Sequence, residues 1–221
     1  MTIVKEPESF DGARQPRQER GRRTREQLLN AAAELFAERG ATGLTVAEVT
    51  RRAGVANGSA YWLFDNKEAL VRALHERLIG DLEAELRVFD DLADWRRLDL
   101  RSCLARVIHT TTTAMTRQGA FLRAFVLHAN YDEAAASRGW ASVEGVRRQF
   151  ARLMLEHRGE ISHANPEMAV DVCFRTIWAG LSQEMSPPAL RFEDRAEWAP
   201  YSGELVSLCI AYLTNSGEPS G

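Results

Sequence analysis

The residues whose types could do binding chemistry gather in a short window of the sequence. Hydroxyl and amide side chains, two adjacent arginines, two aromatic rings and a lysine follow one another there: Thr45, Arg51, Arg52, Asn57, Ser59, Tyr61, Trp62 and Lys67. Arginine and lysine bind phosphates, and asparagine can pair with the edge of a base. The window therefore has the composition of a surface that binds a nucleic acid.

These side chains need a scaffold, and the local pattern predicts two helices joined by a tight turn. Thr45 and Glu48 have the spacing of a capping box, which starts a helix that ends at the next glycine. A short helix over 57–63 follows. Residues 45–63 thus fit a helix-turn-helix, whose second helix lies in the major groove of DNA. Lys67 falls in the first turn of the next helix, where free N–H groups attract phosphate.

A longer helix is expected on each side of this motif. The first opens at Thr24, which begins a second capping box, and ends at Gly40. The other is capped by Asp65 or Asn66 and carries apolar residues at helical spacing as far as Phe89. We expect it to run from one domain into the other.

Helical periodicity continues through the rest of the chain, and no segment alternates convincingly as a strand would. Further helices are expected near 97–117, 119–129, 138–158, 166–185 and 195–214. The predicted fold class is all-α, with an N-terminal three-helix helix-turn-helix domain and a larger C-terminal helical domain. The predicted parts are a disordered basic arm over 1–20, the first domain over 21–66 and the second over 67–216.

Charge is unevenly distributed along the chain. The net charge is −3, but residues 12–25 contain six arginines and a single acidic residue, Glu19. A basic arm on a mildly acidic body predicts an anionic partner at one end. The arm either enters a minor groove or runs along phosphates, as basic arms do, or it only keeps the chain in solution.

Other classes of protein find little support in the sequence. The longest run without a charge, Leu205–Gly217, is shorter than the roughly 18 residues of a membrane span. The N-terminus lacks the apolar stretch of a secretory signal, so we expect a cytoplasmic protein. The histidines and the three cysteines lack the spacing of a metal site, and no phosphate loop or nucleophile elbow occurs. We expect no metal, no cofactor and no enzymatic activity.

Five segments of the N-terminal region match a known family. They are REQLLNAAAELFAERG at 25–40, GLTV at 43–46, AGV at 53–55, GSAYWLF at 58–64 and KEAL at 67–70. With this spacing the chain resembles the TetR family of bacterial transcriptional regulators over about residues 22–74. The remainder is similar to that family in length and in the number of helices.

The resemblance implies roles for the residues of the window. Thr45 caps the second helix and contacts a phosphate, Asn57 and Ser59 face the bases, Tyr61 and Trp62 meet the backbone, and Lys67 holds a phosphate. Apart from the resemblance, the place of Arg51 and Arg52 at the end of the preceding helix leads us to expect contacts with either guanines or phosphates. Tyr61 could instead pack between helices.

The chain departs from the family pattern at three positions. Ala56 stands where a serine often caps the recognition helix, so Asn57 either caps this helix or reads a base. Trp62 and Leu63 stand where histidine and a hydroxylated aromatic residue are common.

Within the second domain, one stretch mixes apolar bulk with isolated polar groups, as a ligand cavity does. The candidate ligand-binding residues are Cys103, Val107, His109, Thr110, Phe121, Phe125 and His128, together with Trp178 from a later helix. Ordinary core packing would produce the same mixture. That a cavity exists here is implied mainly by the family resemblance.

The resulting hypothesis is a one-component regulator, a repressor of double-stranded operator DNA that a small, largely apolar effector releases. The helices near 166–185 and 195–214 carry more apolar surface than one face can bury, so they are expected to form a homodimer interface. Ile177, Trp178, Leu205 and Leu208 are the candidates to face the partner. The alternatives are a DNA-binding accessory protein without a ligand and a helical protein that binds or converts small molecules.

Overall fold

The computed structural model describes residues 15–119, 122–125, 132–184 and 198–216. Every regular element in these ranges is a helix and none is a strand, so the all-α prediction is confirmed. The chain forms two compact units, one that extends to Leu74 and one that begins at His75. None of the helices in the described part of the chain is long and apolar enough to cross a membrane.

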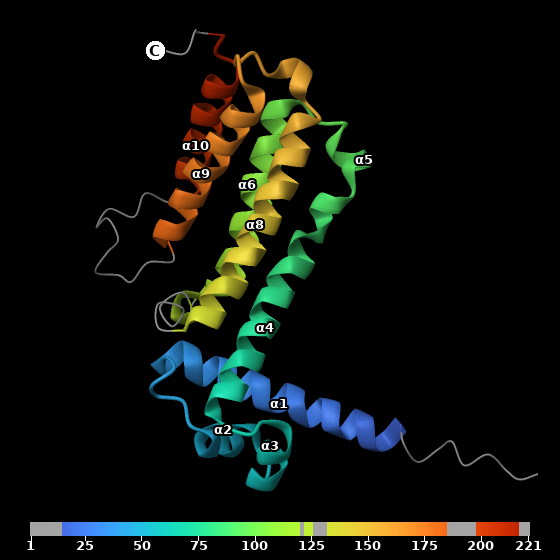
Figure 1. Ribbon diagram of the computed structural model, residues 1–221, viewed down its shortest axis with the longest axis vertical. Coiled ribbons are helices and arrows are strands. Elements are labelled where there is room, and N and C mark those ends of the chain that lie inside the picture. Colours follow the sequence, from blue (N-terminus) through green and yellow to red (C-terminus); the bar gives the residue numbers. More distant parts are fainter. Residues whose placement is uncertain (1–14, 120–121, 126–131, 185–197, 217–221) are drawn as a thin grey trace, which may run out of the picture. The chain divides into compact units, whose positions relative to one another are not determined.

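The N-terminal unit is built from three helices and the start of a fourth (Figure 1). They are α1 (Gln15–Arg39), α2 (Val46–Ala53), α3 (Asn57–Leu63) and α4 (Lys67–Leu86), of which α4 continues into the second unit. Their inward faces bury a small apolar core: Leu28, Leu35, Phe36, Leu44, Val49, Phe64, Leu70 and Leu74. Removal of this apolar area from water holds the helices together.

Local signals fix where α2 begins and ends. The Thr45 hydroxyl accepts the Glu48 N–H at 3.2 Å, so the predicted cap of this helix is confirmed. Gly54 has a φ of +65°, in the left-handed region that other residues rarely adopt. This conformation lets the Val55 N–H reach the Thr50 carbonyl at 3.0 Å, which closes the tight turn before α3.

The start of α4 has a side-chain cap that can be tested directly. Asn66 Oδ1 accepts the Ala69 N–H at 2.8 Å, so of the two predicted caps it is Asn66 that acts. The Asn66→Ala variant should lose about 1 kcal/mol of stability, because the backbone N–H of Ala69 loses its side-chain acceptor. Urea unfolding measures this loss. Asp65→Ala, one residue away, is the control and should unfold like the wild type; equal losses in both variants would contradict the assignment.

The first helix begins earlier than the sequence indicates, so the expected start at Thr24 is wrong. Thr24 lies inside α1, and its hydroxyl donates to the Arg20 carbonyl at 2.9 Å. Threonine can bond backbone groups both at a cap and within a helix, so its pattern is ambiguous. The expected disordered arm over 1–20 is likewise wrong for residues 15–20, which are helical; residues 1–14 lie outside the described residues.

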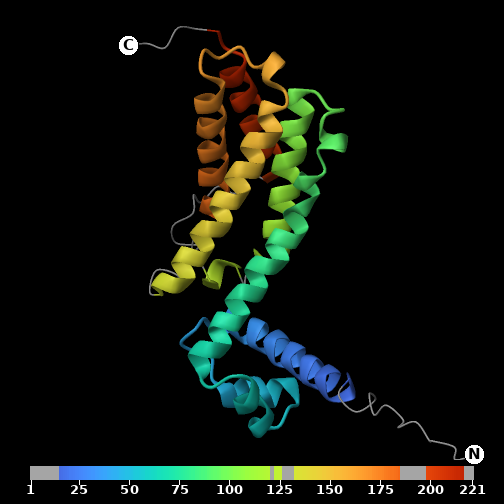
Figure 2. The ribbon, with the colours of Figure 1, turned by 45° about the vertical axis from the view of Figure 1, so that its right-hand side comes forward.

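The C-terminal unit is a bundle of helices (Figures 1 and 2). Helix α8 lies beside α9, α10 packs on both α6 and α9, and α6 also contacts α8. The helices after α4 are η1 (Arg87–Asp90), α5 (Leu92–Trp95), α6 (Leu100–Arg117), α8 (Glu133–Leu155), η2 (Arg158–Glu160), α9 (Pro166–Glu184) and α10 (Trp198–Leu213).

Side-chain caps explain where most of these helices begin. The observed helix ends differ from the predicted ones only by a few residues. Asp99, Asp132 and Asn165 accept N–H groups at the first turns of α6, α8 and α9, which confirms the proline start of α9. Helix α8 begins five residues earlier than expected because Asp132 caps it. Helix α4 ends three residues before Phe89, whose ring packs in a 3-10 turn against Trp95. The expected helix over 119–129 lies partly outside the described residues.

One continuous helix belongs to both units. The division at Leu74 and His75 falls within α4, whereas the sequence placed it before Lys67. The expectation that this helix runs from one domain into the other is therefore confirmed.

Candidate nucleic-acid interface and ligand cavity

The helix-turn-helix presents an exposed face made of polar and aromatic side chains. Tyr61 is 56% exposed and Trp62 is 80% exposed, although large aromatic side chains are normally buried. The alternative in which Tyr61 packs between helices therefore does not describe this structure. Thr45, Asn57 and Ser59 are exposed on the same short segments. An exposed aromatic pair beside hydrogen-bonding groups indicates a contact surface.

Asn57 is tied back to the preceding helix. Its Oδ1 lies within hydrogen-bond distance of the Thr50 hydroxyl, which also approaches the Ala47 carbonyl at 3.0 Å. Thr50 is buried, so this contact links the start of α3 to α2 across the turn. The cap position of α3 is Ala56, which supplies no side-chain bond, so the alternative in which Asn57 caps this helix is wrong.

The two adjacent arginines have different surroundings. Arg52 forms a two-pronged ion pair with Glu38 of α1, at 2.6 and 3.1 Å, and only 29% of its side chain is exposed. Arg51 is 73% exposed and contacts Glu48 at 2.7 Å. The guanidinium of Arg52 holds the pKa of Glu38 below its usual value, and that of Arg51 does the same for Glu48. Arg52 thus fastens α2 to α1, whereas Arg51 projects from the surface.

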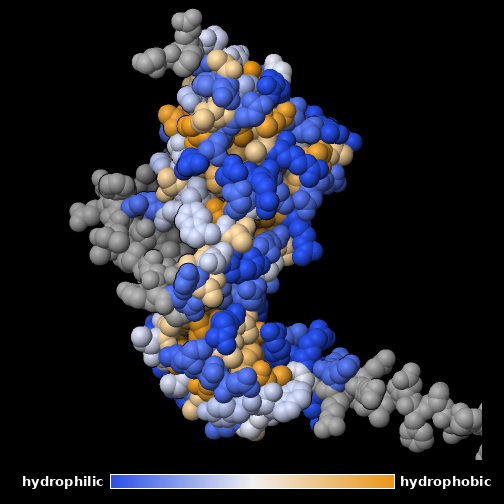
Figure 3. All heavy atoms as spheres, viewed as in Figure 1, coloured by the Kyte–Doolittle hydropathy of each residue, from blue (hydrophilic) through white to orange (hydrophobic). Residues whose placement is uncertain are grey.

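Positive charge borders this face on two sides. Lys67 is half-buried at the first position of α4, beside the Asn66 cap. The first turns of α1 carry exposed arginines, and the visible face of this end of α1 is mostly hydrophilic (Figure 3). Of these arginines, Arg22 and Arg23 make only long, exposed ion pairs, at 3.4 Å, with Glu26 and Glu19. Such pairs stabilise little and leave the charge available to a partner.

The C-terminal unit contains a separate apolar cavity of about 360 Å³. Its wall comes from α4, α6, the 122–125 segment, α8 and α9, and the described lining has no Asp, Glu, Lys or Arg. The lining residues are His75, Leu78, Ile79, Leu82, Leu86, Thr111, Ala114, Met115, Leu122, Phe125, Ala135, Ala136, Gly139, Trp140, Ser142, Val143, Val146, Trp178 and Ser182. Cavities of this size and composition bind small molecules.

The ligand-binding residues predicted from the sequence differ in how close they lie to the cavity. Phe125 and Trp178 line the cavity, and Val107 lies with Trp178 around a smaller void beside it. Cys103 is instead wholly buried in the core, where burial raises the pKa of its thiol to about 11. Phe121 and His128 lie outside the described residues.

Two polar residues of α6 that the sequence predicted to bind the ligand do not face the cavity, because of their place in the helical turn. His109 is exposed and Thr110 is half-buried, and neither lines the cavity; the lining residue is Thr111. The stripe Val107, Thr111, Ala114 has a spacing of four and three residues, which would have identified Thr111 from sequence. The α4 residues and Trp140 were missed because they lie far from 103–128 in sequence.

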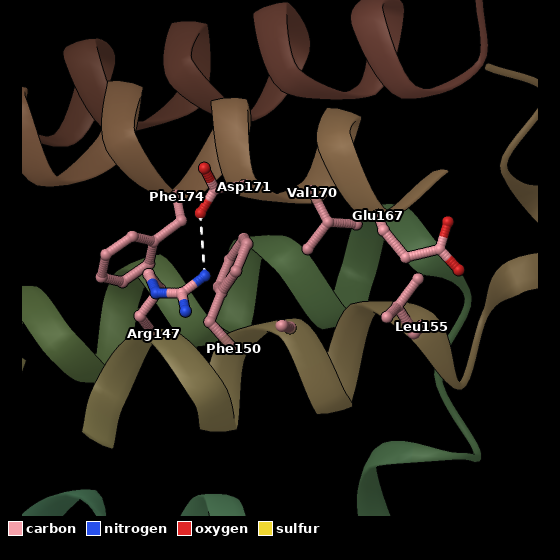
Figure 4. Close-up of a pocket in the computed structure, with 8 residues that line it drawn as sticks. Arg147, Phe150, Leu155, Glu167, Val170, Asp171 and Phe174 are labelled. Atoms are coloured by element: carbon pink, nitrogen blue, oxygen red, sulfur yellow. Dashed lines mark hydrogen bonds and ion pairs between the residues drawn. The ribbon is translucent and has the colours of Figure 1, made fainter. Parts of the chain in front are cut away.

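A second, smaller pocket of about 180 Å³ lies between α8 and α9 (Figure 4). Arg147 donates to Asp171 across it at 3.0 Å and to both carboxylate oxygens of Glu144 at 2.8 Å. These carboxylates raise the pKa of Arg147 above its usual value. Because its charges satisfy one another, this pocket is a structural joint between two helices rather than a ligand site.

Neither part of the site has the chemistry of a metal centre. Across the described ranges, no group of three or more His, Cys, Asp or Glu side chains is placed to hold a metal ion. The described residues thus define a two-unit helical protein, with an exposed helix-turn-helix face on one unit and an apolar cavity in the other.

The comparisons with known proteins agree with this class. The family described as "Bacterial regulatory proteins, tetR family" matches residues 28–74. The family described as "Tetracyclin repressor-like, C-terminal domain" matches residues 99–213, more than half of the chain. The chain therefore belongs to the TetR family. The first of these two families is described as regulatory proteins, and its match includes the helix-turn-helix.

Several curated relatives are similar over less than half of the chain. The chain is 38% identical over 90 residues to the HTH-type transcriptional regulator TtgR of Pseudomonas putida, covering 38% of this chain and 42% of the relative. It is 38% identical over 95 residues to the repressor KstR2 of Rhodococcus jostii, covering 43% and 44%. It is 33% identical over 112 residues to the regulator AcrR of Shigella flexneri, covering 48% and 49%. The matches span less than half of each relative.

Solved structures share the fold over nearly the whole chain. A protein from Mesorhizobium loti assigned to the TetR family superposes with a TM-score of 0.64 at 18% identity, covering 88% of this chain and 96% of the other. The TetR-family regulator PfmR from Thermus thermophilus gives a TM-score of 0.61 at 13% identity, covering 83% and 96%.

Proposed function

We propose that the chain is a dimeric cytoplasmic repressor that leaves double-stranded operator DNA when a small, largely apolar effector enters the cavity. The observation that carries the proposal is the course of α4. Lys67, at its start, borders the exposed face, and five residues further along the same helix line the cavity. An effector that shifts this wall acts on the helix that carries the DNA-facing lysine. The effector then favours the conformation that fits DNA less well.

The proposed roles follow the exposure of each side chain. Thr45 and Lys67 hold phosphates, and Tyr61 and Trp62 lie along the DNA backbone. We assign the contacts with base edges to Ser59, to Arg51 and to the amide nitrogen of Asn57. We revise the role of Arg52 from a DNA contact to a positioning residue, because Glu38 already binds its guanidinium.

We place the dimer interface on α9 and α10, as the sequence suggested. Ile177 and Leu205 are buried within the chain and Trp178 lines the cavity, so of the four candidates only Leu208 is exposed, at 57%. Other exposed apolar side chains lie on the same two helices: Met168, Tyr201 and Tyr212. A two-fold contact between copies would bury this surface in an isologous four-helix arrangement.

The direct test is binding to the DNA upstream of the chain's own gene, measured by fluorescence anisotropy over a range of salt concentrations. We expect this fragment to bind at least about 10³-fold more tightly than random duplex of the same length, as specific regulators do. Equal affinity for both duplexes would favour the accessory protein without sequence preference. No binding to either would favour a small-molecule-binding protein.

Lys67→Ala should weaken binding to operator and random DNA by the same factor, because a phosphate contact carries no sequence information. Loss of one ionic contact should reduce the slope of log K against log salt by about 0.9. Lys67→Arg, which keeps the charge, and Thr45→Ala, which removes only a neutral hydroxyl, should keep the wild-type slope. A changed sequence preference at constant slope in Lys67→Ala would contradict the role.

A further inference from the structure

We infer that the cavity takes an uncharged molecule with a flat ring system and one hydrogen-bonding group, placed against the Thr111 hydroxyl. Only the consequence of binding for DNA rests on the proposed function; binding itself is a property of the C-terminal unit. Three features of the lining carry the inference: its charge, its polar groups and its rings.

Charge is absent from the described lining, and the carboxylate of Glu83, which follows the lining residue Leu82 in the sequence, is already paired. Glu83 lies outside the lining and receives two bonds from Arg138, at 2.9 and 3.1 Å. The hydrogen bond from Arg138 lowers the pKa of Glu83. A ligand with a fixed charge would therefore find no counter-ion among the described lining residues, and its burial would carry a large desolvation cost.

Of the residues that bring a hydroxyl group to the lining, Thr111 is the most deeply buried. His75 and Ser182 have partners of their own, and Ser142 is half-buried. The Thr111 hydroxyl makes no hydrogen bond to any residue that the structure describes, although the side chain is only 6% exposed. Its neighbour Thr112, by contrast, donates to the Ile108 carbonyl at 2.7 Å. Thr111 thus presents an unused polar group to the cavity, which a ligand can satisfy.

The aromatic rings of the lining also differ in whether they already have a ring partner. Phe125 stacks on His75 with centroids 4.9 Å apart, and Trp178 stacks on Phe174 at 6.2 Å. Trp140 lines the cavity, is 68% exposed, and has no ring partner within the described ranges. An aromatic ligand that stacks on Trp140 would remove this face from water and gain a ring contact.

A matched set of two-ring probes tests charge and flatness separately, by isothermal titration calorimetry on the full chain without DNA. We expect 2-naphthol to bind once per chain, and 2-naphthoate to bind at least about 100-fold more weakly because its carboxylate is unpaired. Decahydro-2-naphthol has the same skeleton but is not flat, and it should bind about threefold to tenfold more weakly than 2-naphthol. Equal or tighter binding of either competitor, or no binding of 2-naphthol, would overturn the inference.

Two substitutions locate the probe. Thr111→Val should weaken 2-naphthol binding about fivefold to tenfold and leave naphthalene binding unchanged, because only the naphthol loses a hydrogen bond. Thr112→Val is the matched control, since its hydroxyl bonds the backbone and it does not line the cavity. Trp140→Leu should abolish the preference for 2-naphthol over decahydro-2-naphthol. Equal effects of the two threonine substitutions would overturn the placement against Thr111.

A separate measurement distinguishes this inference from the proposed function. The probes are added to the chain already bound to its upstream DNA, and anisotropy follows release. Tight 2-naphthol binding without release would leave the ligand class intact and contradict effector control. Release by 2-naphthoate but not by 2-naphthol would support effector control and contradict the inferred ligand class.

Discussion

The Leu208→Glu variant should sediment as a monomer at micromolar concentrations at which the wild-type chain is a dimer. Leu208 is 57% exposed on α10, and a two-fold contact would place it and its copy in the same interface. The variant therefore puts two unpaired carboxylates into a buried surface. At several kcal/mol per buried charge, the dimer dissociation constant should rise by at least about 100-fold. Operator affinity should fall with it, since a monomer reaches only one half-site.

Val88→Glu is the matched control for this result. Val88 is an exposed apolar residue of the same unit, at 42%, but it lies in η1 and not on α9 or α10. This variant should remain dimeric and bind the operator as the wild type does. Circular dichroism should report the same helix content in all three proteins. A monomeric wild type, or a dimeric Leu208→Glu variant, would show that the interface lies elsewhere or does not exist.

The second large effect is expected from the first turns of α1. Replacement of four arginines by glutamine should lower the slope of log K against log salt by between about 2 and 4, because each phosphate contact contributes about 0.9. The four are Arg20, Arg22, Arg23 and Arg25, all exposed on a helix that makes no core contact there. Thermal unfolding should stay unchanged. A selection from randomised operators should also show whether the variant loses a preference for A·T-rich flanks.

The control removes the same charge from the other unit. Arg97, Arg101, Arg148 and Arg152 are exposed, and their replacement by glutamine should leave the slope at its wild-type value. If both quadruple variants lower the slope equally, the effect is one of overall charge. If neither lowers it, the basic helix serves only solubility. Truncation would be a less specific test, because removal of residues 1–20 would also remove the start of α1, from Gln15 to Arg20.

Local signals could be read from the sequence because they act over three or four residues. Thr45 bonds the N–H three positions on, and Gly54 provides the left-handed turn, so both ends of α2 were predictable. The same locality misled at Thr24, since a threonine makes equally good bonds within a helix. The start of α9 was predicted correctly from Asn165 and Pro166, because a capping residue followed by proline is typical of the first helical position.

Features that depend on distant residues were not predictable from one sequence. Nothing near Arg52 indicates that Glu38, fourteen positions earlier, binds its guanidinium and removes it from the interface. The cavity wall needs α4 and α8 to lie opposite α6, so Leu82 and Trp140 carry no local mark of their role. Thr110 was chosen over Thr111 because four threonines in a row hide the register. The apolar stripe that starts at Val107 resolves it.

The junction inside α4 also governs how this chain can be recombined with its relatives. Because the boundary between the units falls at Leu74, within α4 and not in a loop, a new sensor would have to be joined to the N-terminal unit inside a helix. A graft must be made in helical phase. One extra residue turns everything after it by about 100° and advances it by about 1.5 Å, which would misdirect His75 and the wall beyond. Useful chimaeras should therefore come only from crossovers that keep the residue count between Lys67 and Leu86.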